Sequence, residues 1–357
     1  MAPKFNILKI KEVRQETEDC VSIAFDVPEA LWPDYQFVQG QYLTLRETIN
    51  GEDIRRSYSI CSGVQEKDLR VAIKKVYEGK FSTYANDILK AGDQMQVMTP
   101  SGKFHTKLDP NQAKNYVLFA AGSGITPILS IMKTVLATEP KSEITLFYGN
   151  KTTDSVIFKE EIEALKNKNF TRLKVHYIMS REKLQSDLFC GRIDKPKTDQ
   201  LLNLLVQKDK VDEYFICGPY QMIQDVNASL KEADIDEKKI HFELFSTGPV
   251  ATAQAPKKKA PAEKINAKVQ VILDGDRYDF NIYNSDETIL DTALNNGADL
   301  PFACKGGVCA TCKAKVEEGE VDMIVNYGLE PDEVKAGFVL TCQATPKTDK
   351  VVINFDA

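Results

Sequence analysis

Four cysteines in the last third of the chain have the spacing of a metal centre. Cys304, Cys309 and Cys312 follow the pattern C-x4-C-x2-C, and Cys342 lies 30 residues further on. This spacing is typical of a [2Fe–2S] cluster held by four thiolates. A structural zinc site is one alternative, but such sites usually contain two C-x2-C pairs and only one is present here. Four buried thiols without a metal are the other alternative.

The loop that carries these cysteines is rich in small residues, among them Gly306, Gly307 and Ala310. Four thiolates must converge on two irons, so the backbone has to wrap closely around the cluster, and small residues permit this approach. Backbone N–H groups can then point at the sulfur atoms and tune the reduction potential. We therefore expect the four cysteines to be the metal ligands.

Two segments of the first hundred residues have the composition of a nucleotide site. Arg56-Ser57-Tyr58-Ser59 ends an alternating apolar run, and Gly79-Lys80-Phe81-Ser82-Thr83 leads into a short helical stretch. Glycine with Ser or Thr at a helix start offers free N–H groups to a diphosphate. The alternatives are a surface Arg beside a strand Tyr for the first segment, and an ordinary N-cap by Ser82 for the second.

A glycine-rich turn, Gly122-Ser123-Gly124-Ile125-Thr126-Pro127, follows a strand-like run at 116–120 and opens a helix. Its glycines let the backbone approach a diphosphate, and the helix N-terminus supplies N–H donors and a positive dipole. Pro127 suits a first helical turn. The motif departs from G-x-G-x-x-G because proline replaces the third glycine, and tight helix packing is the alternative explanation.

Two later strand ends carry residues suited to a nicotinamide nucleotide. Cys217-Gly218-Pro219 ends a strand at 214–216, and Ser180-Arg181 follows a strand at 175–179. An Arg in this position can pair with a 2′-phosphate, whereas an acidic residue would bind the ribose. An inert strand thiol and a solvated Arg are the respective alternatives.

The periodicity of the chain indicates which elements position these motifs. Residues 5 to about 106 form short alternating runs separated by turns, which predicts an antiparallel barrel. From 115 to 245, strand-like runs alternate with amphipathic helices, which predicts a parallel sheet. The predicted strands are 116–120, 143–148, 173–179, 213–217 and 240–245, and the predicted helices are 126–137, 155–168, 198–208 and 219–232. A hairpin (267–273 and 277–283) and a helix (288–296) are predicted further on.

Residues 246–264 contain Pro, Ala and Lys and almost no bulky apolar side chain, so they cannot bury a core. We expect an extended tether here. The predicted domains are therefore 1–106, 107–245 and 265–357.

Composition and charge narrow the functional classes. The formal net charge is −6, which argues against binding nucleic acid through bulk charge. Residues 115–132 carry no charge, but their glycines and Pro127 indicate a buried strand, loop and helix instead of a membrane span. No signal peptide is evident. We expect a cytoplasmic protein without a membrane span, whose cysteines are thiols or metal ligands.

Residues 267–355, with the sequences Ala303–Cys312 and Leu340–Gln343, resemble the plant-type ferredoxin domain. The paired motifs at 56–59 and 79–83, with G-x-G-x-x-P and C-G-P, resemble the ferredoxin–NADP reductase superfamily. The resemblance implies a multidomain fold: an antiparallel β-barrel flavin domain binding FAD (1–106), an α/β NAD(P)-binding domain with a parallel sheet (107–245), a flexible linker (246–264) and a β-grasp [2Fe–2S] ferredoxin domain (265–357).

The same resemblance assigns roles to individual residues. It implies that Tyr58 packs on the isoalloxazine, that Arg56 contacts the phosphates and that Cys217 lies near the nicotinamide C4. Phe245 would lie against the flavin, although a core Phe on the last strand is the alternative. The implied catalytic residues are Cys217, Tyr58 and Ser59. The implied cofactor-binding residues are Arg56, Ser57, Tyr58, Ser59, Gly79, Phe81, Ser82, Thr83, Gly122, Gly124, Thr126, Pro127, Ser180, Arg181, Cys217, Gly218, Pro219 and Phe245.

The domain order resembles that of bacterial oxygenase reductases, nearest to those of the phenylacetyl-CoA epoxygenase type. It implies electron transfer from NADPH, or NADH, through FAD and the [2Fe–2S] cluster to an oxygenase component, a di-iron epoxygenase or monooxygenase. Three alternatives stay open: a reductase for a Rieske dioxygenase or membrane hydroxylase, an electron-transfer subunit without NADPH as its own donor, and a redox sensor.

Charge is unevenly distributed along the chain. Residues 265–357 carry 8 basic and 16 acidic side chains, whereas residues 1–245 are close to neutral. An acidic carrier domain can steer toward a basic partner surface. We therefore expect the oxygenase to dock on the ferredoxin domain, with solubility as the alternative role of this charge.

Overall fold

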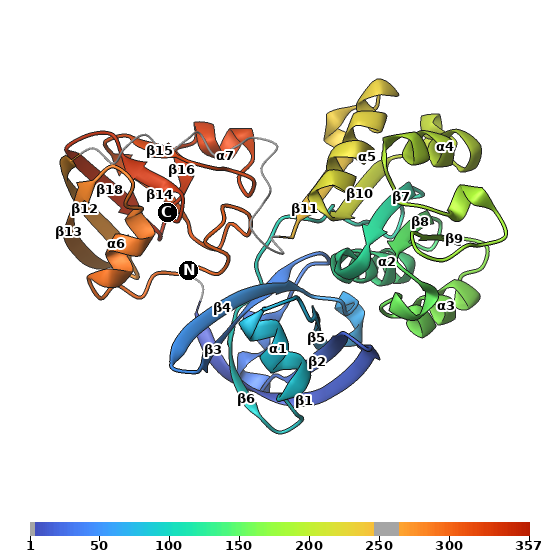
Figure 1. The fold of residues 1–357 in the computed structure, drawn as a ribbon, viewed down its shortest axis with the longest axis horizontal. Coiled ribbons are helices and arrows are strands. Elements are labelled where there is room, and N and C mark those ends of the chain that lie inside the picture. Colours follow the sequence, from blue (N-terminus) through green and yellow to red (C-terminus); the bar gives the residue numbers. More distant parts are fainter. Residues whose placement is uncertain (1–3, 246–263) are drawn as a thin grey trace. The chain divides into compact units, whose positions relative to one another are not determined.

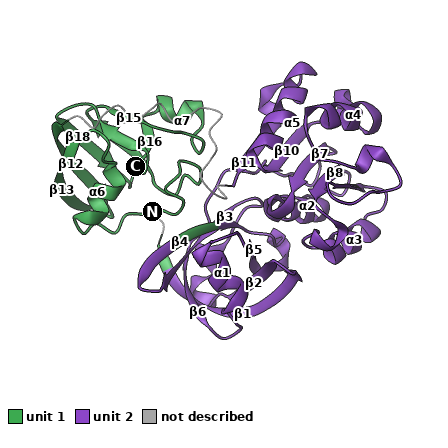
Figure 2. Ribbon diagram, in the orientation of Figure 1, with its two compact units in different colours: residues 1–5, 55–57, 246–357 green, residues 6–54, 58–245 purple. Residues whose placement is uncertain are grey.

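The computed structural model describes residues 4–245 and 264–357. The predicted tether lies outside the described residues, except for Lys264, which is the first residue of a strand and so belongs to the following domain. The chain divides into two compact units (Figure 2). One contains residues 6–54 and 58–245, and the other contains residues 1–5, 55–57 and 246–357.

The amino-terminal part is a curled antiparallel sheet with strand order β4-β3-β6-β1-β2-β5 (Figure 1). In β1, buried Leu8 and Ile10 alternate with exposed lysines, as expected for a strand with one face on a core. A bridge between Ile60 and Val71 joins the segment after β4 to β5, so the two ends of the strand order meet. The elements are β1 (Phe5–Thr17), β2 (Cys20–Asp26), β3 (Tyr42–Ile49), β4 (Glu52–Ser59), β5 (Leu69–Lys74), α1 (Lys80–Asp87) and β6 (Gln94–Met98).

The central part is a five-stranded parallel sheet with order β11-β10-β7-β8-β9 and helices on both faces. Side chains of α2 and α3 pack in one apolar core, and those of α4 and α5 pack in a second core. The elements are β7 (Asn115–Ala121), α2 (Ile125–Thr138), β8 (Glu143–Asn150), α3 (Lys159–Lys168), β9 (Leu173–Met179), α4 (Lys195–Leu205), β10 (Glu213–Gly218), α5 (Tyr220–Glu232) and β11 (Ile240–Leu244).

Three predicted helix boundaries in this part are wrong, and one of them is the end of α4, which lies at Leu205 instead of residue 208. Helix α3 begins at Lys159 instead of residue 155, because residues 153–155 form a separate 3-10 turn and Phe158 is left-handed, with φ of 60°. Helix α4 begins at Lys195 instead of residue 198. Its N-cap is Asp194, whose carboxylate accepts the Lys197 N–H, and a proline stands in the first turn.

The first apolar core also contains residues of the amino-terminal part, including Cys61, Ala72 and Phe104. The sheet and the nucleotide-type part therefore form one compact unit, and the division at 106/107 stays a prediction.

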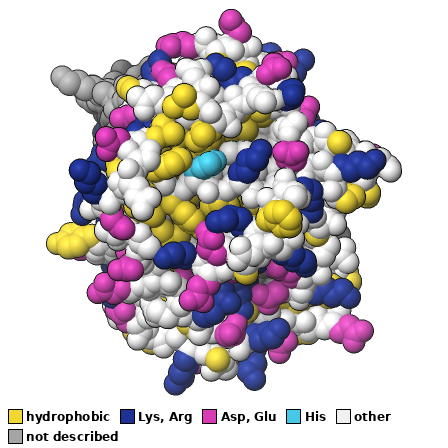
Figure 3. All heavy atoms as spheres, turned by 90° about the vertical axis from the view of Figure 1, so that its right-hand side faces the viewer, with side chains coloured by type: hydrophobic (Ala, Val, Ile, Leu, Met, Phe, Trp, Pro, Cys, Tyr) yellow, Lys and Arg dark blue, Asp and Glu magenta, His cyan; other side chains and the backbone are white. Residues whose placement is uncertain are grey.

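Strand β9 forms one edge of the parallel sheet. Here the His176 ring lies between two phenylalanine rings, with centroids 5.3 Å from Phe147 and 5.5 Å from Phe189. Figure 3 shows hydrophobic side chains gathered near a histidine on this side of the molecule, with basic side chains beside them. The stacked rings bury part of the imidazole, and burial lowers the pKa of His176.

The carboxyl-terminal part is a mixed five-stranded sheet with order β13-β12-β18-β14-β16, plus a two-stranded sheet of β15 and β17. Strands β12 and β18 are parallel, and α6 buries Ile289, Leu290 and Ala293 in the core. The elements are β12 (Lys264–Leu273), β13 (Asp276–Asn284), α6 (Ile289–Asn295), β14 (Lys313–Glu318), β15 (Val321–Met323), α7 (Pro331–Lys335), β16 (Phe338–Leu340), β17 (Ala344–Pro346) and β18 (Lys350–Asn354).

The predicted hairpin and helix lie in this sheet and beside it. Asp274 and Gly275 join β12 to β13 with φ of 52° and 83°, the two left-handed conformations that an Asp-Gly hairpin turn supplies. Helix α6 is followed by Asn296 and then by Gly297 with φ of 89°. The predicted fold class is confirmed for all three parts. In the described ranges 4–245 and 264–357, no helix combines the length and apolarity needed to cross a membrane.

Candidate functional site

The cysteine loop between α6 and β14 has the tight backbone that a cluster requires. Lys305, Gly307 and Ala310 all have positive φ, of 50°, 74° and 52°. A Cβ on Gly307 would lie 3.0 Å from the Val325 carbonyl oxygen, and one on Gly328 would lie 2.8 Å from the Val308 oxygen. Small residues are therefore required where the 325–328 segment packs against this loop.

The sulfur atoms of this loop accept several hydrogen bonds. The Gly306 and Cys309 amides lie 3.3 and 3.5 Å from Cys304 Sγ. The Thr311 hydroxyl donates to Cys309 Sγ at 3.2 Å. Gln343 Nε2 lies 3.8 Å from Cys342 Sγ. Donors of this kind stabilise negative charge on sulfur, which a thiolate ligand carries.

The four cysteines form two pairs. The Cys309 thiol lowers the pKa of Cys304 by hydrogen bonding, and the Cys312 thiol lowers the pKa of Cys342 in the same way. No group of three or more His, Cys, Asp or Glu side chains able to hold one metal ion is found in the described part of the chain. A [2Fe–2S] cluster takes four thiolates, two on each iron, so the two pairs fit the predicted cluster.

The two flavin-type motifs meet in the curled sheet. The Tyr58 ring at the end of β4 lies 5.7 Å from the Phe81 ring in α1. The hydroxyl of Ser82 accepts the Val76 N–H and donates to the Gly79 carbonyl, both at 3.2 Å. Ser82 is therefore not the N-cap of α1; Gly79 holds that position.

Gly79 is needed where it stands, because a Cβ there would lie 2.3 Å from a Val76 methyl and 2.4 Å from Ser82 Oγ. The first hydrogen bond of α1 runs from Thr83 N to Gly79 O. The earlier amides of the first turn are thus available to an anion. Arg56 is exposed and Ser57 half-buried on β4. Their phosphate and flavin contacts stay predictions.

The glycine turn and the Cys-Gly-Pro segment lie against each other. A Cβ on Gly124 would lie 2.2 Å from the Cys217 carbonyl oxygen, so only glycine permits this approach. Gly122 has φ of 54°, and its carbonyl accepts the Tyr148 hydroxyl at 3.1 Å. Thr126 donates to the Ser123 carbonyl at 3.0 Å. Pro127 stands in the first turn of α2, and Pro219 is the N-cap of α5.

A polar cluster forms where three elements end. Ser59 at the end of β4 donates from Oγ to Glu243 Oε2 at 3.0 Å. Glu243 on β11 is paired in register with Cys217 on β10. The hydrogen bond and the strand pairing thus bring two predicted catalytic residues, Ser59 and Cys217, close to Glu243. The sequence analysis did not select Glu243.

Burial controls the charge of this cluster. It raises the pKa of Glu243 to about 8, although the Ser59 hydrogen bond acts in the opposite direction. Burial, with a smaller effect of Glu243, raises the pKa of the Cys217 thiol well above its usual value. At neutral pH the carboxyl is mostly protonated and the thiol is neutral. Phe245, which follows β11, packs on the apolar core that contains Cys217.

Ser180 and Arg181 follow β9, at the same end of the parallel sheet as Cys217 but on its edge strand. The Ser180 hydroxyl donates to the Asn150 carbonyl at 3.1 Å, and the Arg181 amide donates to the Lys151 carbonyl at 2.8 Å. Strand β9 is three strand spacings from β10, about 14 Å. The structure therefore does not bring Arg181 to Cys217, but this separation suits the two ends of one dinucleotide.

Glu243 is the residue that motif reading missed. It stands between two apolar residues in the segment 242–245, where the resemblance gives a role only to Phe245. The available signal was topological: a parallel strand beside the Cys-Gly-Pro strand must end at the same edge of the sheet, so its polar residue faces the same site.

Comparisons with known proteins identify the family of each of the three parts. Residues 7–106 match the oxidoreductase FAD-binding domain family, residues 118–228 the oxidoreductase NAD-binding domain family, and residues 271–347 the 2Fe-2S iron-sulfur cluster binding domain family. These matches confirm the predicted FAD, NAD(P)H and [2Fe–2S] cluster.

Full-length relatives also match. One component of the 1,2-phenylacetyl-CoA epoxidase of Escherichia coli (strain K12) is 44% identical, with 99% of this chain and 98% of the relative covered. The ferredoxin reductase component of 3-ketosteroid-9-alpha-monooxygenase from Rhodococcus rhodochrous is 34% identical, with 98% and 96% covered. The solved structure of phthalate dioxygenase reductase has a TM-score of 0.59 at 23% identity, covers 98% of both chains and supports the fold.

Proposed function

Because this chain belongs to the ferredoxin reductase-type reductases with FAD-, NAD- and 2Fe-2S-binding domains, whose relatives serve oxygenase systems, we propose that it transfers electrons from NADPH to the oxygenase component of a phenylacetyl-CoA-type di-iron epoxygenase. The observation that carries the proposal is the contact of Ser59, Cys217 and Glu243 beside the Gly122–Gly124 turn.

The chain's own residues have distinct tasks at this site. Tyr58 offers an aromatic face to the flavin ring, and the first turn of α1 offers amides to the diphosphate. Ser59 fixes the Glu243 carboxyl by a hydrogen bond, and this carboxyl holds a proton at neutral pH. When bound, FAD supplies the change from two-electron to one-electron chemistry, and the cluster supplies single-electron transfer.

Cys217 has a packing and orienting role in this proposal. Its thiol is buried and neutral, so it does not act as a nucleophile. With Gly124 directly against its carbonyl, it forms the surface on which the nicotinamide ring would stand. Phe245 covers this region, and the nicotinamide would have to displace it.

The preference for NADPH over NADH rests on Ser180 and Arg181. Both follow β9 at the sheet edge, where their backbone is tied to the Asn150–Lys151 segment. A guanidinium in this position suits the 2′-phosphate of NADPH. The neighbouring Glu182 is held by Thr153, whose amide and hydroxyl donate to it at 2.6 and 2.9 Å. These two hydrogen bonds hold the Glu182 carboxylate against Thr153.

The oxygenase would dock on the acidic ferredoxin domain, which carries 16 acidic and 8 basic residues between 265 and 357. Complementary charge would speed the encounter and make it depend on salt. The same proposal places the protein in the cytoplasm, which cell fractionation would check.

Anaerobic titration tests the proposed function. Purified holoprotein is mixed with NADPH or NADH, and the flavin and cluster absorbances are followed. We expect NADPH to bleach both; an unbleached flavin would refute the reductase activity. Reduced protein is then mixed with the oxygenase component of a phenylacetyl-CoA epoxygenase or of a Rieske dioxygenase at two ionic strengths. Faster reoxidation by the Rieske protein would reject the proposed partner, and a rate independent of salt would reject docking through charge.

A further inference from the structure

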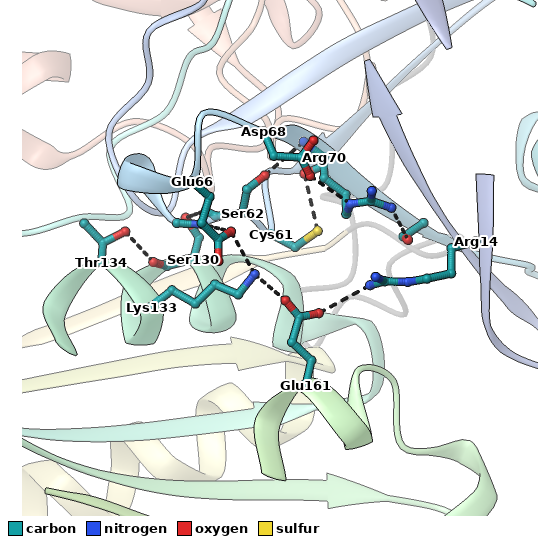
Figure 4. A network of polar contacts seen from close by, with 12 residues as sticks. Arg14, Cys61, Ser62, Glu66, Asp68, Arg70, Ser130, Lys133, Thr134 and Glu161 are labelled. Carbon is teal, nitrogen blue, oxygen red and sulfur yellow. Dashed lines mark hydrogen bonds and ion pairs between the residues drawn. The ribbon is translucent and has the colours of Figure 1, made fainter. Parts of the chain in front are cut away.

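Helix α2 begins directly after the Gly122–Gly124 turn, and one of its faces contacts residues 62–66 of the amino-terminal part. The Ser130 hydroxyl donates to the Ser62 carbonyl at 2.7 Å, and the Val64 amide donates to the Thr134 hydroxyl at 3.2 Å. Figure 4 shows Ser62, Ser130 and Thr134 in one polar network. The middle of the helix that presents the glycine turn is therefore hydrogen-bonded to the segment that follows β4.

Lys133 is the centre of this network (Figure 4). Its ammonium nitrogen lies 3.0 Å from Glu66 Oε2 and 2.5 Å from Glu161 Oε1. Glu66 belongs to the amino-terminal part, whereas Glu161 belongs to α3. The second oxygen of Glu161 accepts a hydrogen bond from Arg14 of β1 at 3.3 Å. The Lys133–Glu161 pair lies within the central part, and the Glu66 and Arg14 pairs at its two ends connect it to the amino-terminal part.

The side chain of Lys133 is only 11% exposed. Burial alone would lower its pKa, but Glu161 and Glu66 outweigh this effect and raise it, so the side chain stays charged. Gly63 permits the close approach, because a Cβ there would lie 3.0 Å from the Cβ of Lys133. Removing one member of a buried ion pair leaves the other charge without compensation.

The network lies about 13 Å along a rigid helix from Gly124, at ~1.5 Å per residue. A displacement of the helix at Lys133 therefore moves the glycine turn and, with it, the surface beside Cys217. Hydride transfer is sensitive to such displacements, because a shift of ~1 Å can cost about 100-fold in rate.

We propose that Lys133 is a positioning residue for hydride transfer, whose ion pairs with Glu66 and Glu161 hold the nicotinamide-binding turn in register with the flavin site. This inference rests on the proposed function. It concerns the distance between the two rings, not the affinity for the nucleotide.

The test compares two lysines that each pair with two carboxylates. Lys133→Met removes the ion pair between α2 and Glu66 and leaves the Ser130 and Thr134 hydrogen bonds in place. Lys195→Met is the matched control, because Lys195 lies 3.1 Å from Asp199 and 2.7 Å from Glu232 but joins only α4 to α5. For each holoprotein, stopped-flow absorbance measures the limiting rate of flavin reduction, the NADPH dissociation constant and the flavin–nicotinamide charge-transfer band.

We expect Lys133→Met to lower the limiting rate about tenfold and to weaken the charge-transfer band, with the dissociation constant changed less than about twofold. Lys195→Met should leave all three unchanged, and Lys133→Arg should restore part of the rate. Glu66→Gln, which keeps the Lys133–Glu161 pair, provides a milder variant and should lower the rate about threefold.

If NADPH reduces the wild-type flavin, and Lys133→Met or Glu66→Gln has the same limiting rate of flavin reduction, this inference is overturned and the proposed function stands. An equal loss in Lys195→Met would also overturn it, because the effect would then be general destabilisation. A wild-type protein that NADPH does not reduce would overturn the proposed function and this inference with it.

Discussion

The cluster loop and the nicotinamide-type site solve the same problem of bringing four groups together, but by opposite routes. Three of the four cysteines predicted to hold the cluster lie within nine consecutive residues, 304–312, and the fourth follows the short strand β16. At the other site Ser59, Gly124, Cys217 and Glu243 come from four separate elements. The first site depends on local backbone conformation, and the second depends on the packing of two sheets and a helix. Substitutions should therefore act differently at the two sites.

The largest effect is expected at the cluster. Cys342→Ser should abolish the cluster absorbance and electron delivery to the partner, because a ligand thiolate is lost. Reduction of the flavin by NADPH should persist, since Cys342 belongs to the other compact unit. Visible absorbance with iron analysis measures this outcome. Cys190→Ser is the control, and loss of the cluster in that variant would contradict the ligand assignment.

The next effect is expected at the 2′-phosphate position. Arg181→Gln should lower kcat/KM for NADPH about 10- to 100-fold, because a hydrogen bond to a charged group contributes about 1.5–3 kcal/mol. Activity with NADH should hardly change. Steady-state kinetics with both nucleotides measures the ratio. Equal losses with both would show that Arg181 supports the fold and not nucleotide choice.

A smaller effect is expected at the polar cluster between the strands. Ser59→Ala and Glu243→Gln should each slow flavin reduction about tenfold, and the double variant should be scarcely slower, because residues in one hydrogen-bonded unit are not additive. Stopped-flow rates at saturating NADPH measure this. Fully multiplicative losses would show that the two side chains act independently.

The same carboxyl predicts a pH dependence of stability. Glu243 has a folded-state pKa of about 8, above the ordinary value of 4.5. Its contribution is fully present below pH 4.5 and is lost as pH rises toward 8, because the unfolded state releases its proton first. As the pH rises from 5 to 8, the Tm of Glu243→Gln should therefore decrease less than the Tm of the wild type. Parallel melting curves would contradict the raised pKa.

The smallest effect is expected at Gln343. Its Nε2 donates to the Lys305 carbonyl at 2.9 Å and lies near Cys342 Sγ. Gln343→Leu should lower the cluster reduction potential by a few tens of mV, since hydrogen bonds to sulfur favour the reduced cluster. Redox titration followed by EPR measures the shift. Gln270→Leu, whose amide bonds Asp279 at 2.8 Å, is the control; a shift of equal size there would remove the assignment.

Local features of the molecule could be predicted from the sequence, and contacts between distant segments could not. The cysteine spacing, the Gly122–Gly124 turn and the Asp274-Gly275 hairpin are local, so a linear pattern predicts them. The contact of Ser59 with Glu243 spans 184 residues, and no local pattern encodes it. Only the register of β10 with β11 places Glu243 opposite Cys217. The buried ion pairs of Lys133 could not be predicted either, because a lysine on an amphipathic helix is normally solvated.

The errors at helix boundaries have a different cause. Apolar periodicity placed α4 three residues late, because the cap at Asp194 and the proline after it lie outside the periodic region. The Ser82 alternative failed for a related reason, since Gly79 caps α1 and Ser82 bonds back to the preceding turn. Termini are decided by side chain–backbone bonds that hydrophobic patterning does not report.

The parallel pairing of β12 with β18 also constrains how the protein is made. These strands join Lys268 to Lys350 and Ile272 to Asn354, and the Asp356 carboxylate accepts the Asp274 amide across 82 residues. Strand β12 thus lacks one of its two neighbours until residues 350–354 have left the ribosome, and such long-range pairing forms slowly. The cysteine loop is synthesised well before that moment. We therefore expect the predicted cluster to be inserted only after this region has been translated.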